Sequence, residues 1–402
     1  MTVFVLGGDQ TDFARNLGRE GLGIDAAIGD VIDGALAAAR LDASAIQAIH
    51  VGNAFGELFT GQAHLGAMPA TVRPALWGLP ASRHEAACAS GSIAILAAMA
   101  DIEAGRYDCV LVIGAEQERN VPGEIGARHM GAAAWVGHEG EGARYLWPHM
   151  FSRIADAYAE RWALDHVHLV AIAKKNLTNA RSNPRAQTRA WTWTDASFGE
   201  DDPGNALVEG RLRRYDCAQV TDGAAAVILA SPKFAAAHAG RMARITGWGH
   251  RTVGLGLDAK LTRHTDNATH LLPHLRQSVV DALRRAELPD ARALDGIEVH
   301  DCFTITEYLA IDHLGLTAPG QAWEAIEAGT HERTGALPIN PSGGLIGGGH
   351  PVGATGVRML VDCTRQVTGH AGETQVEGAT TFGMLNIGGS GTTAVCLIVA
   401  AV

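Results

Sequence analysis

The sequence predicts an α/β fold that is built from two similar halves. Apolar stretches with strand character alternate with helical stretches along the chain, as is typical of α/β proteins. In addition, residues 296–303 repeat residues 48–55, because the I-x-V pattern and the final Phe of the two segments align. A duplication of this kind places corresponding loops of the two halves at a common junction, where a site is expected.

The first half begins with two strands and a helix. Residues 3–6 are an apolar stretch typical of a buried strand, and residues 25–39 have the spacing of an amphipathic helix. A second strand is expected at residues 48–51. Residues 108–115 are apolar throughout, as in a strand buried on both faces. A further helix is expected to begin at Cys88, because Ala- and Leu-rich sequence follows a Ser-Gly-Ser step there.

The second half carries matching elements. The apolar run 224–230 precedes it, a helix is expected at residues 275–286, and a strand is expected at residues 297–299. Residues 381–399 mirror the apolar strand at 108–115.

Residues 118–219 have a different texture, since Gly, His and Arg are frequent and helical spacing occurs at 151–162 and 168–180. We expect them to form an inserted loop domain over the main body. The predicted domains are therefore an N-terminal half at 1–117 and 220–240, the insertion at 118–219, and a C-terminal half at 241–402. The basic side chains of the insertion are expected to lie on a solvated helix face or, alternatively, at a phosphate-binding edge. They are Lys174, Lys175, Arg181, Arg185, Arg189, Arg211, Arg213 and Arg214.

The composition narrows the class of protein. A chain of 402 residues with 47% hydrophobic and 19% charged residues is typical of a globular enzyme, and the net charge of −11 argues against nucleic-acid binding. The six cysteines are scattered without a C-x-x-C pair, which indicates neither a disulfide framework nor a zinc site. No segment has the pattern of a signal peptide or a membrane span. We therefore expect a cytoplasmic protein without a bound metal.

Cys88 is the first candidate for chemistry. The first turn of a helix leaves backbone N–H groups unpaired and carries partial positive charge, so a thiolate placed there is expected to be stabilised and nucleophilic. On local sequence alone, a small buried hydrophobic residue is the commoner role for a cysteine, so the other motifs must decide.

Two further stretches offer reactive side chains. His350 lies in a glycine-rich stretch, residues 340–356, which matches neither a P-loop nor a dinucleotide fingerprint and is typical of backbone that approaches a ligand closely. His300 and Cys302 follow the strand at 297–299. On an extended chain their side chains point the same way, which suits a shared pocket and equally suits two core residues.

Together these residues suggest one class of chemistry. Cys88 is a candidate nucleophile, a histidine can deprotonate it, and Cys302 can move a second proton. Thioester exchange coupled to making or breaking a carbon–carbon bond needs all three functions. The glycine-rich loops would supply N–H groups for the two developing oxyanions.

The three motifs in combination resemble those of the thiolase family over nearly the whole chain. They are Cys88-Ala-Ser-Gly, His300-Asp-Cys-Phe, and the glycine-rich stretch that contains Gly349-His350-Pro. Most thiolases have Asn-Glu-Ala-Phe at the middle motif, whereas His-Asp-Cys-Phe is similar to the sterol-carrier-protein-2 type. This branch also accounts for Asn386-Ile-Gly388, which stands where ordinary thiolases have a second catalytic cysteine.

The resemblance implies a five-layer α-β-α-β-α fold, an inserted loop domain that binds coenzyme A, and a homodimer or homotetramer. It implies that Cys88 is the nucleophile and that His350 activates it and contributes to the first oxyanion hole with His300. Cys302 would move the α-carbon proton, and the N–H groups of Cys88 and Gly388 would form the second oxyanion hole. Coenzyme A would be a co-substrate, and no tightly bound cofactor is implied.

Two other functions remain open at this stage. Relatives of this branch can act as binding or channelling subunits, sometimes with a small zinc-ribbon or OB-type partner protein. Others cleave steroid side chains by retro-aldol chemistry, but those usually lack the nucleophilic cysteine, so Cys88 argues against that reading.

Overall fold

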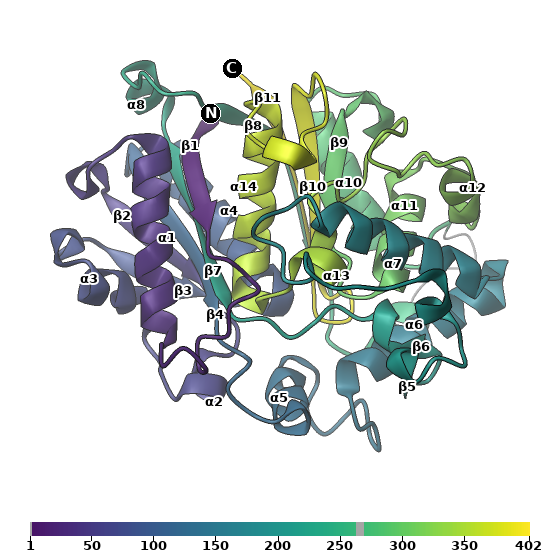
Figure 1. The fold of residues 1–402 in the computed structure, drawn as a ribbon. Coiled ribbons are helices and arrows are strands. Elements are labelled where there is room, and N and C mark those ends of the chain that lie inside the picture. The colour runs from purple at the N-terminus through teal and green to yellow at the C-terminus, as the bar shows by residue number, and fades with distance from the viewer. Residues whose placement is uncertain (1, 263–268) are drawn as a thin grey trace.

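The computed structural model describes residues 2–262 and 269–402. One mixed sheet of nine strands runs through the molecule in the order β3-β2-β4-β7-β1-β8-β11-β10-β9 (Figure 1). The strands are β1 (Val3–Gln10), β2 (Ala48–Gly52), β3 (Ala81–His84), β4 (Cys109–Glu116), β7 (Gly223–Ala230), β8 (Ala243–Thr252), β9 (Gly296–Val299), β10 (Thr381–Gly388) and β11 (Thr393–Ala401).

The strand order repeats itself across the sheet. In the first half β2 and β4 are parallel, and β7 and β1 follow antiparallel. In the second half β9 and β10 are parallel, and β11 and β8 follow antiparallel. The two ladders are joined where β1 pairs with β8, between Val3–Val5 and Ala243–Ile245. The repeat of residues 48–55 at 296–303 therefore reflects two structurally equivalent strands, β2 and β9.

Helices cover the outer faces of the two halves of the sheet, and two further helices lie between the halves (Figure 1). The outer face of the first half packs against α1 (Ile24–Ala39), and the outer face of the second packs against α10 (Pro273–Arg285) and α11 (Thr304–Leu314). Between the two halves lie α4 (Ser90–Glu103) and α14 (Thr355–Val367), in one core with strands of both. This arrangement confirms the predicted five-layer fold.

Glycines allow the two central helices to begin close together. A Cβ atom on Gly91 would lie 2.8 Å from the carbonyl oxygen of Gly353, and one on Gly114 would lie 2.5 Å from the same oxygen. Real Cβ atoms do not approach so closely, so any larger residue would push the start of α4 away from the loop before α14. This contact brings residue 88 and residue 350 to the same junction.

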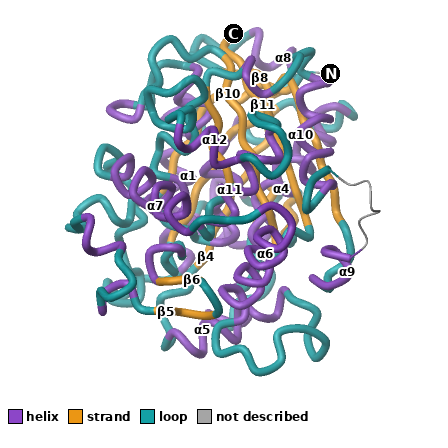
Figure 2. Tube along the Cα trace, turned by 90° about the vertical axis from the view of Figure 1, so that its right-hand side faces the viewer, coloured by secondary structure: helices purple, strands orange, loops and turns teal. Residues whose placement is uncertain are grey.

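The remaining elements are short or lie between β4 and β7. The short helices are α2 (Gly56–Thr60), α3 (Met68–Val72), α8 (Pro232–Ala236), α9 (Leu257–Thr262), α12 (Ala322–Glu327) and α13 (Gly344–Gly348). Between β4 and β7 the chain forms α5 (Gly123–Met130), α6 (Leu146–Trp162), α7 (His166–Ala180), β5 (Leu207–Glu209) and β6 (Leu212–Arg213). Figure 2 shows α6 and α7 across the face turned to the viewer. The predicted helices at 151–162 and 168–180 are thus confirmed, while the domain boundaries stay a prediction.

The basic side chains of this segment do not form one solvated face. Lys175 is buried and forms an ion pair with Glu307, and its Nζ also donates to the carbonyl of Ile339 at 2.8 Å. Most of the others lie against acidic partners as well: Lys174 pairs with Asp195, Arg185 with Asp9, Arg189 with Asp12, Arg211 with Asp156, and Arg213 with Glu200. Most of these basic side chains are therefore paired with carboxyl groups, and a phosphate-binding edge stays a prediction.

No helix within the described ranges is long and apolar enough to cross a membrane. All six cysteines are free thiols.

Candidate active site

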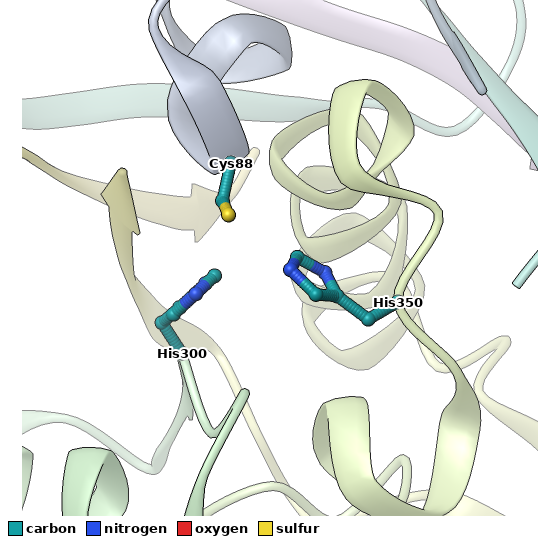
Figure 3. A group of neighbouring side chains, drawn as sticks. All are labelled: Cys88, His300 and His350. Carbon is teal, nitrogen blue, oxygen red and sulfur yellow. The ribbon is translucent and has the colours of Figure 1, made fainter. Parts of the chain in front are cut away.

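Cys88, His300 and His350 meet at the junction of the two halves (Figure 3). The Cys88 sulfur and one ring nitrogen of each histidine all lie within 4.8 Å of one another. The two imidazole rings are nearly perpendicular, at 83°, with centroids 5.1 Å apart. Cys88 and His350 line one cavity of about 220 Å³ together with Cys302. The four side chains predicted from the sequence thus occupy one site.

A strained turn presents Cys88 to this cavity. Residues 87–89 form a single 3₁₀ turn directly before α4, and Ala87 has a φ of +51°, which is costly for a residue with a Cβ atom. Ser90 holds the turn, because its Oγ accepts from the Ala86 N–H (2.9 Å) and donates to the Ala87 carbonyl (2.6 Å). The strained position next to the sulfur is a feature typical of functional sites.

The start of the helix does not by itself make Cys88 a thiolate at rest. Burial raises the pKa of the Cys88 thiol to about 12, and the nearby carboxyl groups of Glu118 and Glu116 add to this rise. The backbone N–H groups of Gly389 and of Cys88 itself favour the thiolate but do not offset the burial. The resting nucleophile is therefore a neutral thiol that needs a base at the moment of attack.

His350 is oriented to be that base. Its Nδ1 lies 2.7 Å from the Oγ1 of Thr355, and this hydroxyl donates its own proton to the carbonyl of Pro351 at 3.0 Å. The hydroxyl must then accept from Nδ1–H, which leaves Nε2 unprotonated. Burial lowers the pKa of His350 to about 3, so the imidazole is neutral and its Nε2 lone pair is free for the Cys88 proton.

His300 has the opposite tautomer. The Oδ1 of Asn386 accepts from Ser92 Oγ at 2.7 Å, so the Asn386 amide group must donate to Nδ1 of His300, at 3.1 Å. The proton of the neutral imidazole then lies on Nε2. Burial and the neighbouring His350 lower the pKa of His300 well below its usual value. One histidine is thus a proton acceptor and the other a neutral hydrogen-bond donor.

These pKa values predict a flat pH profile for the reaction of Cys88 with a thioester. His350 becomes protonated only as the pH falls toward 3, and Cys88 loses its proton only as the pH rises toward 12. We therefore expect the acylation rate to vary less than about twofold between roughly pH 6 and pH 9. The check is the rate of acyl transfer to Cys88 by mass spectrometry, with circular dichroism to confirm that the fold is intact. A rise or fall of the acylation rate with pH, with a midpoint near the ordinary pKa of a histidine or a thiol, would contradict this assignment.

The role of Asn386 predicts a large effect of a nearly isosteric change. In Asn386→Asp, a carboxylate faces Nδ1 of His300 and draws the imidazole proton to that nitrogen, so Nε2 no longer donates. Loss of one oxyanion donor costs about 10²- to 10³-fold in rate. We expect acylation of Cys88 to slow by this factor at unchanged melting temperature. Acylation at the wild-type rate would show that the tautomer of His300 does not matter.

Cys302 is 8% exposed, and its sulfur lies 3.6 Å from Thr306 Oγ1. β9 ends at Val299, so Cys302 lies in the loop after the strand and not on the extended chain assumed from the sequence. Burial and the nearby Cys88 sulfur raise the pKa of the Cys302 thiol well above its usual value. A neutral thiol beside the nucleophile is the form that can donate a proton.

Two buried carboxyl groups hold the loops of the site in place. Asp301 accepts from the backbone N–H groups of Leu345 (2.6 Å) and Ile346 (3.1 Å), and so fixes the loop of His300 and Cys302 against the glycine-rich stretch. Burial raises the pKa of Asp301 to about 7, and Glu307 adds to this rise.

Glu116 makes the equivalent connection in the first half. It accepts from the N–H groups of Ala54 (2.9 Å), Phe55 (3.0 Å) and Gly353 (3.0 Å). It therefore ties the loop after β2 to the loop that carries His350. The sequence pattern gives no signal for either carboxyl group, because each acts on residues far away in the chain.

A backbone N–H group beyond the two predicted for the second oxyanion hole also faces the Cys88 sulfur. The N–H group that faces the sulfur belongs to Gly389, the residue after Gly388. Gly388 itself packs against the turn, since a Cβ atom there would lie 2.3 Å from the Ala86 carbonyl oxygen. Gly388 as a donor of the second oxyanion hole stays a prediction.

The sulfur of Cys88 and the ring nitrogens of His300 and His350 also have the spacing and chemistry of a three-ligand set for a metal ion. However, Nδ1 of each histidine is engaged by a neighbour, and the tautomers suit proton transfer.

The fold and the site define a duplicated α/β protein with a cysteine–histidine nucleophilic centre. The family model for the thiolase N-terminal domain matches residues 3–190, and the thiolase C-terminal domain-like model matches residues 258–401. An acetyl-CoA acetyltransferase of Methanothermobacter thermautotrophicus is 31% identical over 399 residues, which cover 98% of this chain and 97% of that protein. Sterol carrier protein 2 of Bos taurus is 29% identical over 405 residues, which cover 98% of this chain and 72% of that protein. The chain belongs to the thiolase family.

Solved structures share the fold at lower identity. The Ltp2-ChsH2(DUF35) aldolase has a TM-score of 0.78 at 20% identity and covers 100% of this chain and 98% of that chain. The Acat5 thiolase from Ascaris suum, solved in complex with coenzyme A, has a TM-score of 0.69 at 17% identity and covers both chains completely.

Proposed function

We propose that this protein is an acyl-CoA C-acyltransferase, which cleaves a 3-oxoacyl-CoA with coenzyme A or condenses two acyl-CoA molecules in reverse. The observation that carries the proposal is the pair of opposite tautomers around Cys88: an unprotonated nitrogen of His350 and an N–H of His300. A thiol nucleophile needs the first, and the oxyanion of a tetrahedral intermediate needs the second. The thiolase family membership supports the same chemistry.

In the cleavage direction, His350 takes the proton of Cys88 while the sulfur attacks the C3 carbonyl of the substrate. The oxyanion accepts from Nε2–H of His300. When the carbonyl re-forms, the C2–C3 bond breaks and its electron pair stays on C2, where Cys302 supplies a proton to release acetyl-CoA. Protonated His350 returns a proton to the Cys302 thiolate across the shared site. Neutral His350 then takes the proton of the thiol of a second coenzyme A, whose sulfur attacks the acyl-Cys88 thioester. His350 passes this proton to the departing Cys88 sulfur, which frees the shortened acyl-CoA and restores both thiols.

Coenzyme A enters this scheme as a co-substrate, without a tightly bound cofactor. We assign its binding to residues 118–219, whose helix α6 and neighbouring loops line the cavity above Cys88 with Leu146, Trp147 and Phe151. The Ascaris suum neighbour is described in complex with coenzyme A, which supports coenzyme A as the co-substrate.

We further propose a cytoplasmic homodimer or homotetramer. The free state of all six cysteines supports a reducing compartment. A second candidate function is a channelling subunit that works only with a small zinc-ribbon or OB-type partner, or a retro-aldolase. The Ltp2-ChsH2(DUF35) aldolase favours this alternative, whereas the complete set of Cys88, His350 and Cys302 favours the acyltransferase.

A thiolysis screen tests the function. Purified protein is incubated with coenzyme A and acetoacetyl-CoA, medium-chain or sterol-derived 3-oxoacyl-CoA, and formation of the shorter acyl-CoA is followed. We expect cleavage of at least one class by the protein alone. Cleavage only after co-expression with a genomic neighbour would favour the channelling subunit, and retro-aldol products without acyl transfer would favour the aldolase.

A further inference from the structure

We propose that Glu118 is a specificity-determining residue, which selects acyl groups that carry a hydroxyl near the reacting carbons. The inference deepens the proposed acyltransferase function by naming a substrate class, and it rests on that function.

Glu118 lies in the wall of the catalytic cavity. It follows the end of β4 by two residues and lines the same space as Cys88, Cys302 and His350. The residue is 2% exposed. Its backbone N–H donates to Asp222 Oδ1 at 2.7 Å, which fixes the residue from behind. The backbone N–H groups of Val352 and Thr221 also donate to the carboxyl group, which is therefore a fixed part of the cavity wall and not a mobile surface charge.

One oxygen of this carboxyl group has no use within the protein. Oε1 of Glu118 is buried and has no hydrogen-bond partner among residues 2–262 and 269–402. The proposed reaction does not engage it either, because the Cys88 proton passes to His350 and the C2 proton comes from Cys302. A buried polar atom left unpaired is costly, so a partner on the substrate is the expected compensation.

The rest of the cavity wall is apolar, and this limits which substrate group can pair with Glu118. Large hydrophobic side chains surround the space beside Glu118: Phe55, Met130, Leu146, Trp147, Phe151 and Val352. A plain alkyl chain fits these walls but leaves Oε1 unpaired. An acyl group that is mainly apolar and carries one hydroxyl satisfies both.

A hydroxyl also suits either protonation state of the carboxyl group. Burial raises the pKa of Glu118 well above its usual value, and the acidic neighbours Glu116 and Asp222 add to this rise, so the neutral acid is favoured. A neutral acid can donate a proton from one oxygen and accept on the other, whereas a carboxylate only accepts. A hydroxyl does both, and so pairs with Oε1 in each case.

The test compares 3-oxoacyl-CoA substrates of equal chain length, plain or with one hydroxyl at successive carbons beyond C3. For the wild type we expect kcat/KM to be roughly 10- to 100-fold higher for the best hydroxylated substrate than for the plain one. Glu118→Leu should abolish this preference and raise turnover of the plain substrate. Glu118→Gln should keep part of it, because an amide both donates and accepts.

The matched control is Gln117→Leu. This neighbouring side chain is also buried but points its amide toward the carbonyl of Leu22 and not into the cavity. It should change both substrates by the same factor. Equal turnover of plain and hydroxylated substrates by the wild type, or a Glu118→Leu variant that slows both equally, would overturn the proposal.

Binding of unreactive thioether analogues separates this proposal from the proposed function. In one outcome, the wild type transfers no acyl group but binds the hydroxylated analogue at least tenfold more tightly than the plain one, and Glu118→Leu binds both equally. The selectivity then stands, and the proposed acyltransferase function fails. If acyl transfer occurs without any such difference in binding or turnover, the function stands and the role of Glu118 fails.

Discussion

Cys88→Ala should lose at least about 10⁴-fold in the rate of thiolysis while keeping its fold, because nothing else in the cavity can take its place as the acyl acceptor. Cys302 lies nearby, but its sulfur contacts Thr306, whereas His350 lies against Cys88. The rate is measured as acyl-CoA formation under saturating coenzyme A, with circular dichroism to establish folding.

The matched control for this loss is Cys396→Ala. Cys396 is a thiol buried on β11, in the core of the second half. Its replacement should cost a small amount of stability and leave the rate within about threefold of the wild type. A Cys88→Ala variant that retains more than a few per cent of wild-type activity would rule out the covalent mechanism.

Cys302→Ala should separate the acylation of Cys88 from the proton transfer at C2. The variant keeps Cys88, His300 and His350, so we expect it to form the acyl-enzyme from acetyl-CoA near the wild-type rate. It lacks the group that exchanges a proton with C2, and general acid–base catalysis contributes about 10²- to 10⁴-fold. Deuterium exchange at the α-carbon of acetyl-CoA, followed by NMR, should slow by that factor.

Two results would contradict this role of Cys302. Unchanged exchange in the variant would make Cys302 a packing residue, and loss of acylation together with exchange would indicate a collapsed site. Cys302→Ser is the second variant: a hydroxyl preserves the volume but is a much weaker acid than a thiol, so exchange should fall while the melting temperature stays close to that of the wild type.

The duplicated α/β architecture could be predicted from the sequence because the strand and helix patterns are local and occur in both halves. The I-x-V segments at 48–51 and 297–299 are equivalent strands of the two halves. Cys88 and His350 each lie in the chain that leads into a central helix, α4 or α14. The predicted gathering of Cys88, His300, Cys302 and His350 at one site is what this duplication produces.

The electrostatics of the site could not be predicted in the same way. The start of a helix does favour a thiolate, but burial and the carboxyl groups of Glu116 and Glu118 outweigh it, and no local pattern shows how deeply Cys88 lies or which acids face it. In the sequence, Asn386 is notable only because it stands near the position where ordinary thiolases have a second catalytic cysteine. Its function as the group that sets the His300 tautomer depends on Ser92, which lies on α4 and is far away in the chain from Asn386 on β10.

Lys175 is a similar case. In the sequence it belongs to a basic stretch, yet in the structure it is a buried ion-pair partner of Glu307, which in turn accepts from Asn340 at 2.8 Å near the glycine-rich loop. A charge pattern along a helix does not reveal which member points inward when its partner is more than a hundred residues away.

The most direct test of the central claim is the mass of the protein after incubation with acetyl-CoA alone. A nucleophilic Cys88 activated by His350 predicts one acetyl group per chain, located by peptide mapping on the peptide that contains Cys88 and removed by free coenzyme A. A folded wild-type protein without the acetyl group, or one acetylated at Cys302 with Cys88 unmodified, would contradict it.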